Sequence, residues 1–300
     1  MRVFVTGATG FIGSAVVREL LDAGHRVTGL ARSDEGAASL AAAGAGVLRG
    51  SLTDLDSLRA GAAGSDGVIH TAYIHDFSES NDAAAYARID GRAIEVMGEA
   101  LAGSGRPLVV AAGLPAPAPG SRTTEEDAAP ENPVYPRVSE GAALAFAGRG
   151  VRASALRMPP TVHGEGDHGF VPALIGIARA QGLSAYVGDG SNRWSAVHRL
   201  DAARLFRLAV ESAPAGTRLN AVGDEGVPFR EIAEVIGRHL DLPVKSLSPQ
   251  EAIGHFGLFA VFAQFDVPAS SAATQERLGW QPVHPGLIAD LDEGHYFTGA

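Results

Sequence analysis

The sequence predicts an α/β protein with a doubly wound parallel sheet and a smaller C-terminal lobe. Short apolar runs alternate with longer helical segments over the first half of the chain. These runs are apolar nearly throughout, which is typical of parallel strands that helices cover on both faces. After about residue 157 the alternation gives way to loops rich in glycine and proline. We therefore expect a separate lobe in the second half.

Six apolar runs are the expected strands of the sheet, at residues 3–6, 26–30, 46–49, 67–71, 107–112 and 152–156. The first helix is expected over residues 12–23, where Ile12, Val16 and Leu20 recur at helical spacing and Gly24 follows as a C-terminal cap. Further helices are expected at residues 82–102, 200–212 and 229–240. The pattern therefore contains the repeated strand and helix units of a parallel sheet.

The expected division of the chain is a nucleotide-binding domain over residues 1–157 and a mainly substrate-binding lobe over residues 158–300. A short apolar segment at residues 218–222 follows one of the later helices. Because such a segment fits a further strand, we expect the stretch near residues 197–223 to return to the first domain.

Composition narrows the class of protein. The 300 residues are 46% hydrophobic and carry a formal net charge of −10, with no basic cluster, which argues against a nucleic-acid partner. No apolar run reaches the ~18 residues of a membrane helix, so no membrane partner is expected. The chain has no cysteine, which fits a reducing compartment. The expected location is cytoplasmic.

The stretch VFVTGATGFIG carries the strongest functional signal. An expected strand runs directly into Gly7, Gly10 and Gly13, and a helix follows. In a Rossmann-type fold such a turn allows close approach of the backbone to a pyrophosphate, which the helix N-terminus then binds. The alternative is a turn that is merely tight. We expect a dinucleotide at this turn.

Longer motifs carry a resemblance to a known group of enzymes. TGATGFIG, VIHTA, LRMPPTVHGEGD, GDGSNRW and VHRLDAARLFRLAVE follow one another along most of the chain. With these motifs the sequence resembles the extended and atypical short-chain dehydrogenase/reductases, the NAD(P)-binding epimerase/dehydratase group. The resemblance implies an oxidoreductase or a related enzyme with a nicotinamide cofactor, and it leaves the substrate open.

Charge at the end of the second expected strand favours NADP(H) over NAD(H). NAD enzymes place a carboxylate there, whereas this chain has Ala31, Arg32 and Ser33. A solvent-facing arginine is the alternative reading. Ser51 stands where the family often has an aspartate near the adenine, and Leu52 would cover the ring. The expected cofactor-binding residues are Gly7, Ala8, Thr9, Gly10, Phe11, Ile12, Gly13, Arg32, Ser33, Ser51, Leu52, Thr71, Ala72 and Tyr73.

Two groups that the family normally uses for catalysis are missing. Its serine position reads Ala111 or Ala112, and four residues after Tyr135 stands Ser139 in place of the family's lysine. The single lysine of the chain is Lys245, in the expected lobe. Without a nearby cation a phenol stays protonated, which suits donation of a proton to a developing alkoxide. The expected reaction is therefore a reduction.

Tyr135 and His163 are the two expected catalytic residues, as alternative proton donors. Pro136 favours a helix that starts at residue 136 and leaves Tyr135 at its entrance. Tyr135 then acts as the proton donor or packs on the sheet as a loop aromatic. Arg137 can partly replace the missing lysine. His163 follows the sixth expected strand, at the edge of the sheet where ligands bind.

Four residues in loops are the expected substrate contacts: His75, His168, Arg193 and Trp194. The alternation HGEGDH also raises the question of a metal site, but its spacing matches no standard ligand motif, so no metal is expected. Four phenylalanines from Phe256 to Phe265 recur every three residues. They are expected to pack within the lobe or to wall an apolar pocket.

Together these features predict an NADP(H)-dependent oxidoreductase that reduces a carbonyl or imine of a small organic molecule. Two alternatives stay open. One is a protein that binds NADP(H) without turnover in a structural or sensing role, and the other is a lyase or isomerase of the epimerase/dehydratase type. The family often dimerises through helices that correspond to residues 82–102, so a homodimer is an expected assembly.

Overall fold

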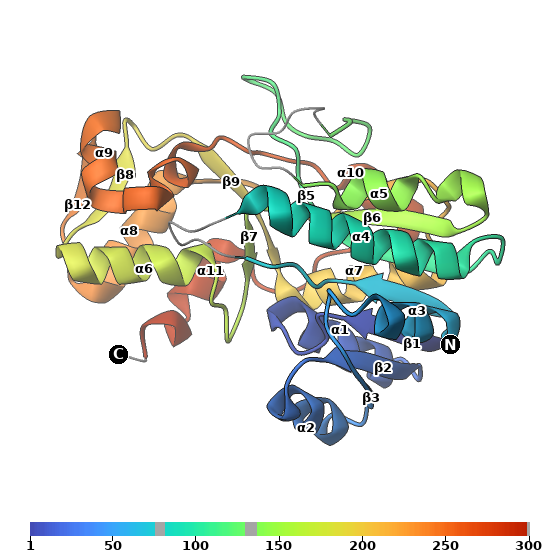
Figure 1. Cartoon of the computed structure of the whole chain (residues 1–300). Helices are drawn as coiled ribbons and strands as arrows, with labels where there is room; N and C mark the ends of the chain where they lie inside the picture. The colour runs from blue at the N-terminus through green and yellow to red at the C-terminus, as the bar shows by residue number, and fades with distance from the viewer. Residues whose placement is uncertain (76–81, 130–136, 299–300) are drawn as a thin grey trace.

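A seven-stranded parallel sheet forms the centre of the computed structural model, which describes residues 1–75, 82–129 and 137–298 (Figure 1). The strand order is β10-β6-β5-β4-β1-β2-β3, and every neighbouring pair is parallel. The strands are β1 (Arg2–Thr6), β2 (Arg26–Ala31), β3 (Gly46–Arg49), β4 (Gly67–His70), β5 (Pro107–Gly113), β6 (Arg152–Met158) and β10 (Thr217–Asn220).

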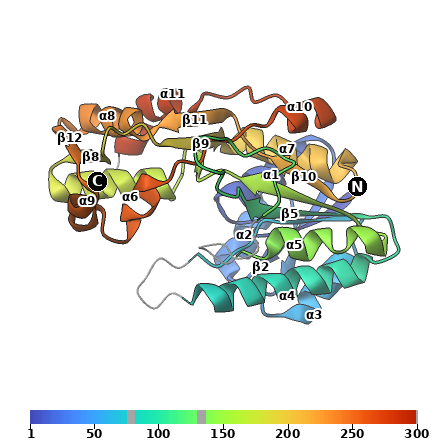
Figure 2. The same cartoon turned by 90° about the horizontal axis from the view of Figure 1, so that it is seen from above.

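Helices cover both faces of this sheet (Figure 2). On one face lie α1 (Phe11–Asp22), α2 (Asp34–Ala42) and α7 (Arg199–Ser212), which share an apolar core with β1 and β2. On the other face lie α3 (Leu55–Ala63), α4 (Ala83–Leu101) and α5 (Ser139–Leu144), and the short helix η1 (Ala147–Arg149) follows. Strands β1, β4 and β5 need apolar side chains on both sides because helices bury both of their faces.

The lobe lies beyond the carboxyl ends of the strands and has a core of its own. It contains a sheet of β7 (Thr161–His163), β9 (Arg193–His198) and β11 (Asp224–Pro228), and a pair formed by β8 (Ser184–Val187) and β12 (Val244–Leu247). Its helices are α6 (Phe170–Gln181), α8 (Phe229–Leu240), α9 (Pro249–Phe256), η2 (Gly257–Ala260), η3 (Phe262–Gln264), α11 (Leu287–Asp292) and η4 (His295–Phe297). The remaining helix, α10 (Ala272–Leu278), contacts α7 and β10 at the central sheet.

The chain returns from the lobe to the central sheet. After β9 it forms α7, which packs against α1, and then β10, which pairs with β6 from Thr217 opposite Ser154 to Asn220 opposite Arg157. It then leaves again to form β11, and it comes back once more at α10, where the amide of Asn220 donates to the Thr274 hydroxyl at 2.8 Å. The stretch near residues 197–223 therefore lies partly in the central sheet, as a helix and an edge strand.

The doubly wound fold is confirmed, with shifts at several ends of elements. The fourth strand stops at His70, one residue earlier than expected, and the sixth runs on to Met158. The helix expected from residue 136 begins at Ser139 instead, with Val138 as its N-cap. On α4, Ala93, Val96 and Met97 are buried inside the protein. Among the described residues no helix combines the length and apolar character that crossing a bilayer requires.

Candidate functional site

The glycine turn between β1 and α1 is closed by contacts that leave no room for side chains. Gly7 has φ +66°, and a Cβ there would lie 2.7 Å from the amide nitrogen of Ala72. A Cβ on Gly13 would lie 1.9 Å from the carbonyl oxygen of Gly7. The amide of Gly10 donates to that same oxygen at 2.9 Å. The turn therefore holds α1 against β1 at a distance that only glycine permits.

The N-terminus of α1 is open to an anion. Gly10 is the N-cap, no side chain caps the helix, and its first turn holds no acidic residue. The free amides and the helix dipole both favour negative charge at this point. Ala8 is buried behind the turn, whereas Thr9 and Gly10 are exposed. Binding of a pyrophosphate by the backbone from Gly7 to Gly13 stays a prediction, and these features of the turn agree with it.

Two arginines, Arg32 and Arg49, lie at the neighbouring ends of β2 and β3. Only Arg32 was identified from the sequence. Arg32 and Ser33 are exposed after the buried Ala31, and the Ser33 hydroxyl accepts from Gly36 N at 3.1 Å to cap α2. Arg49, at the end of β3, donates to the Ser33 carbonyl and pairs with Asp34 at 2.9 Å. Arg49 was missed because the strand that carries it becomes a neighbour of β2 only in the folded sheet.

The remaining expected cofactor residues lie at the same edge of the sheet. The Thr71 hydroxyl donates to the carbonyl of Thr6 at 2.8 Å, which ties the end of β4 to the end of β1. Ser51 and Leu52 follow β3 and are half-buried, and Leu52 packs against the core beneath α3. These residues and the glycine turn come together because parallel strands end on one side.

Aromatic and basic side chains form a second group beside the turn, which we call the mouth cluster: Phe11, Tyr73, His75, Arg137 and His168. The Arg137 guanidinium lies 3.9 Å from the centre of the Tyr73 ring. The Tyr73 and His75 rings are 5.0 Å apart, and His168 stacks edge-on against Phe11 at 5.8 Å. Two expected substrate contacts, His75 and His168, therefore lie in one cluster with an expected cofactor residue.

Arg137 gives the mouth cluster a positive charge. Loss of hydration around the ring, with repulsion from Arg137 and His168, lowers the pKa of His75 to about 4, although part of the ring is exposed. His75 is therefore neutral at neutral pH. The orientation of Arg137 is set by its stacking on Tyr73, a contact that no local sequence pattern indicates.

Ser139, the residue that the sequence predicts in place of the family's lysine, belongs to a buried chain of hydrogen bonds. Its hydroxyl donates to Asp90 Oδ2 at 2.6 Å, and the other oxygen of Asp90 lies 3.0 Å from His70 Nε2. His70 Nδ1 lies 2.7 Å from the Thr6 hydroxyl. All four side chains are buried. This series of hydrogen bonds links α5, α4, β4 and β1. Residue 139 therefore contributes a hydroxyl to it and no ammonium group.

His163 lies in a different environment from the mouth cluster. Its side chain is fully buried, and Nδ1 lies 2.8 Å from the buried carboxylate of Asp290. It lines a polar cavity of about 120 Å³ with His198, His284, Asp201 and Asp224. Within the described part of the chain, His163 Nε2 has no hydrogen-bond partner. A polar cavity of this size has room for water molecules that could satisfy it.

Two further histidines in this cavity are held by hydrogen bonds at Nδ1. His284 Nδ1 lies 2.9 Å from Asp201, and His198 Nδ1 accepts from the amide of Leu200 at 3.3 Å. The rings of His198 and His284 stack at 4.7 Å. Burial first, and then repulsion from His163, lowers the pKa of His198 to about 4. No pattern in the sequence indicated this cavity, because its residues come from β7, β9, α7 and the loop after α10.

Arg193 and Trp194 are the first two residues of β9, within the lobe. Trp194 is 1% exposed and packs edge-on against Phe170 and Phe229. Arg193 pairs with Asp266 at 3.0 Å. The structure does not place these two residues in the mouth cluster, and their role as substrate contacts stays a prediction.

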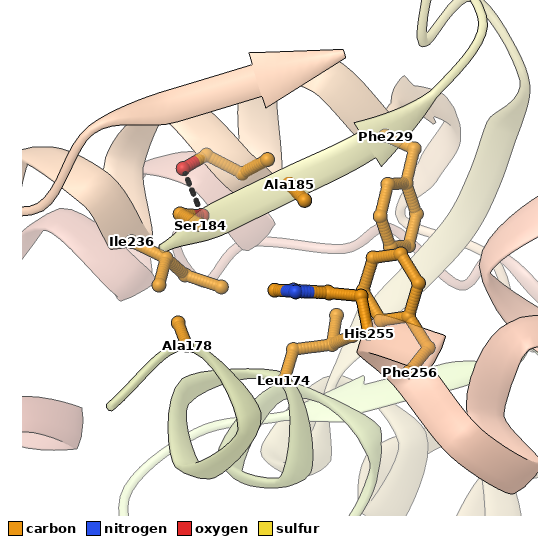
Figure 3. A pocket seen from close by; sticks show the side chains of 9 residues that line it. Leu174, Ala178, Ser184, Ala185, Phe229, Ile236, His255 and Phe256 are labelled. Carbon is orange, nitrogen blue, oxygen red and sulfur yellow. Dashed lines mark hydrogen bonds between the residues drawn. The ribbon is translucent and has the colours of Figure 1, made fainter. Parts of the chain in front are cut away.

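The phenylalanines near the C-terminus pack within the lobe core. Figure 3 shows the void beside Phe256 and Phe229, where the Ser184 hydroxyl donates to the carbonyl of Ala233 at 2.7 Å. The void measures about 10 Å³, which is about the least that can hold one water molecule. It therefore has no room for an organic substrate.

Tyr135 and Asp76, with the rest of residues 76–81 and 130–136, lie outside the described residues. The expected role of Tyr135 as proton donor consequently stays a prediction. The described residues on either side, His75 and Arg137, both belong to the mouth cluster.

The fold and the glycine turn define an enzyme class, the short-chain dehydrogenase/reductase type with a nicotinamide cofactor. Residues 3–221 match the model of the NAD dependent epimerase/dehydratase family. The chain belongs to that family, as the motifs in its sequence predicted.

Similar proteins extend over nearly the whole chain. The uncharacterized protein C2A9.02 of Schizosaccharomyces pombe is 52% identical over 99% of this chain and 100% of its own length. A 2-alkyl-3-oxoalkanoate reductase of Stenotrophomonas maltophilia is 31% identical over 77% of this chain and 73% of its own. Among solved structures, MoeE5 in complex with UDP-glucuronic acid and NAD has a TM-score of 0.74 and 26% identity, covering 97% of this chain and 96% of that one.

Proposed function

We propose that the protein is an NADP(H)-dependent reductase that converts a carbonyl or imine of a small organic molecule to the alcohol or amine. The observation that carries this proposal is the hydrogen bond from the Ser139 hydroxyl to Asp90, at the position that the sequence predicts for the family's lysine. Without that ammonium, a phenol nearby keeps its proton at neutral pH. A protonated acid serves reduction, in which the developing alkoxide takes up a proton as the cofactor supplies hydride.

The proposed preference for NADP(H) over NAD(H) rests on two arginines at the end of β2. Arg32 is exposed there, and Arg49 approaches from β3 to contact the Ser33 carbonyl. Two guanidinium groups suit a 2′-phosphate, whereas the Asp34 carboxylate already pairs with Arg49. Binding of the phosphate would exchange that exposed ion pair for a charge-assisted contact. The N-terminus of α1 would hold the pyrophosphate.

The substrate would bind beside the mouth cluster. Arg137 attracts a polarised carbonyl oxygen or a substrate carboxylate, and the neutral imidazole of His75 offers a hydrogen-bond donor. The similarity to a reductase of 2-alkyl-3-oxoalkanoates supports a substrate of this kind, since its name describes a ketone with a nearby carboxylate. We therefore expect small β-keto acids and ketones to be the first substrates to test.

Tyr135 and His163 remain the two candidate proton donors. His163 has the arrangement of a general acid, because Asp290 holds Nδ1 and directs Nε2 away from that carboxylate. Such a histidine accepts a second proton at Nε2 and can release it to a substrate or to water in the cavity. Tyr135 would donate its phenolic proton directly.

Turnover with purified protein tests the proposal. NADPH oxidation is followed with β-keto acids, ketones and cyclic imines, and with no substrate as the blank. Substrate-dependent oxidation that exceeds the blank supports a reductase. Saturable NADPH binding without turnover of any of these compounds would instead favour the binding protein, and isomerisation of a sugar nucleotide without net NADPH consumption would favour the isomerase.

Two variants assign the proton donor. If Tyr135 donates, Tyr135→Phe lowers kcat by about 100-fold or more while His163→Gln has a small effect, and the rate stays level from pH 6 to pH 8. If His163 donates, the order reverses, and His163→Gln has the larger effect on kcat. NADPH affinity serves as the control in both variants, since a change there would indicate damage to the fold.

A further inference from the structure

The chain turns back on itself at the end of α11 and brings three metal-ligating side chains together. Asp290 lies in the last turn of the helix, Glu293 is its C-cap residue, and His295 begins η4. Gly294 between them has φ +87°, a left-handed conformation that favours glycine and reverses the chain. One ligand atom from each of the three residues lies within 4.8 Å of the other two.

The spacing between His295 and Asp290 fits a shared ion better than a direct bond. His295 Nε2 is 3.8 Å from Asp290 Oδ1, beyond hydrogen-bond distance. This nitrogen is buried and has no hydrogen-bond partner among the described residues. Two ligand atoms bound to one tetrahedral ion at about 2.1 Å lie about 3.4 Å apart. A shift of a few tenths of an ångström would therefore bring both atoms onto one ion.

Asp290 is oriented for ligation by its other oxygen. Its side chain is 4% exposed, and Oδ2 lies 2.8 Å from His163 Nδ1, which leaves Oδ1 on the side of His295. Ligating carboxylates are commonly held by such outer hydrogen bonds. Glu293 is exposed, and within the described part of the chain it makes no ion pair, so its carboxylate can turn toward the same point.

We propose that Asp290, Glu293 and His295 bind one divalent transition-metal ion, with Zn²⁺ as the preferred physiological ion. One imidazole and two carboxylates suit a borderline cation, and a water molecule would complete a tetrahedral site. The bound ion would fasten the C-terminal turn to α11, and through Asp290 and His163 to β7. This site does not depend on the proposed reduction and lies on residues that no cofactor contact uses.

Metal titration of the full chain, stripped with a chelator and dialysed, tests the proposal. Isothermal titration with Zn²⁺ is expected to show one ion per chain, and Co²⁺ is expected to give the visible absorption of a four-coordinate site. Bound Zn²⁺ should also raise the Tm, since an ion that binds only the folded state stabilises it. No saturable binding of either ion would overturn the proposal.

Paired variants locate the ion. Glu293→Gln and His295→Gln are each expected to weaken Zn²⁺ binding by about tenfold or more. Glu276→Gln, at an exposed glutamate of α10, and His255→Gln, at a half-buried histidine of α9, are the matched controls and should bind as the unaltered chain does. Glu293 is exposed, so its variant should fold normally. Weak binding that all four variants share would mark adventitious ions and would also reject the site.

Discussion

The nucleotide-binding half and the lobe hold their polar groups in different ways. In the first half the groups expected to bind phosphate are backbone amides, presented by a turn whose glycines contact one another. In the lobe and at its junction the polar groups are side chains that meet from distant segments. His163 and Asp290 are 127 residues apart, and Asp201 and His284 are 83 apart. One region therefore encodes its site locally, and the other encodes it only through the complete fold.

The largest expected effect tests the local site through Gly13→Ala. Its Cβ would lie 1.9 Å from the Gly7 carbonyl oxygen, so α1 must move away from β1. We expect a loss of about 3 kcal/mol in the free energy of unfolding, together with loss of measurable NADPH binding. Urea unfolding and calorimetric titration measure the two effects.

Gly176→Ala is the matched control, because a Cβ in the middle of α6 meets nothing within 4 Å. It should leave stability unchanged or raise it by about 0.5 kcal/mol. Normal cofactor binding by Gly13→Ala would show that the contact between the two glycines is not required.

The loss of stability on substitution of one buried aspartate in each region compares the two regions directly. Asp90→Ala leaves His70 and Ser139 without their shared partner, and Asp201→Ala does the same to the His284 ring and the amides of residues 283 and 284. Each should lower the free energy of unfolding by about 3 kcal/mol, because buried polar groups lose their acceptor. Urea unfolding gives the values.

The Asp56→Ala variant provides the reference for these losses. Asp56 pairs with Arg59 at the surface, with 95% of its side chain exposed, and its loss should change stability by less than about 0.5 kcal/mol. If Asp90→Ala behaved like this reference, the buried hydrogen-bond chain would not support the sheet, and the comparison between the regions would fail.

A smaller effect sharpens the assignment of the cofactor. Arg32→Ala and Arg49→Ala should each weaken NADPH binding about tenfold, which is about 1.4 kcal/mol, and leave NADH binding nearly unchanged. The reason is that only NADPH carries the phosphate that these guanidinium groups would contact. Arg59→Ala, on the exposed side of α3, is the control. An equal loss for both nucleotides would reject the phosphate contact.

The smallest effect concerns pH and His198. Its pKa is about 4 in the folded protein because of burial and repulsion from His163, against about 6.5 when unfolded. Between these two pKa values the unfolded chain binds more protons than the folded chain. The contribution of His198 to stability is therefore fully present above pH 6.5 and is lost as pH falls toward 4. From pH 7.5 to pH 5.5 the loss should be about 1 kcal/mol.

Comparison with His198→Gln isolates this contribution from other titrating groups. Urea unfolding of both proteins at pH 7.5 and at pH 5.5 gives the difference. The variant should lose about 1 kcal/mol less than the unaltered protein. The same pH dependence in both would show that His198 exchanges protons freely in the folded state.

The sequence analysis succeeded where structure follows from local patterns. The glycine turn, the strands of the first half and helix α8 were predicted because apolar periodicity and turn chemistry extend over a few residues. Within the lobe, β8 and β12 are four residues long and partly exposed, and their pairing follows from a register that no local pattern encodes. These strands were not predicted.

The candidate site divides in the same way. The backbone that would hold the phosphates was predicted residue by residue. Arg49 and the histidine cavity were not, because their partners arrive from other strands and from the C-terminal loop. At Trp194 the local pattern was misleading. Its glycine-rich neighbourhood indicated an exposed loop, whereas its side chain is buried in the lobe core.

The path of the chain between the two parts has a practical consequence. It passes out after β6, back through α7 and β10, out to β11, back to α10 and out again to α11. A single proteolytic nick at any one of these passages would leave the two parts connected by the others. Removal of everything beyond residue 158 would strip the edge strand from β6 and uncover the face that α7 shields. Neither part is therefore an autonomous fragment, and expression of one alone should yield aggregated material.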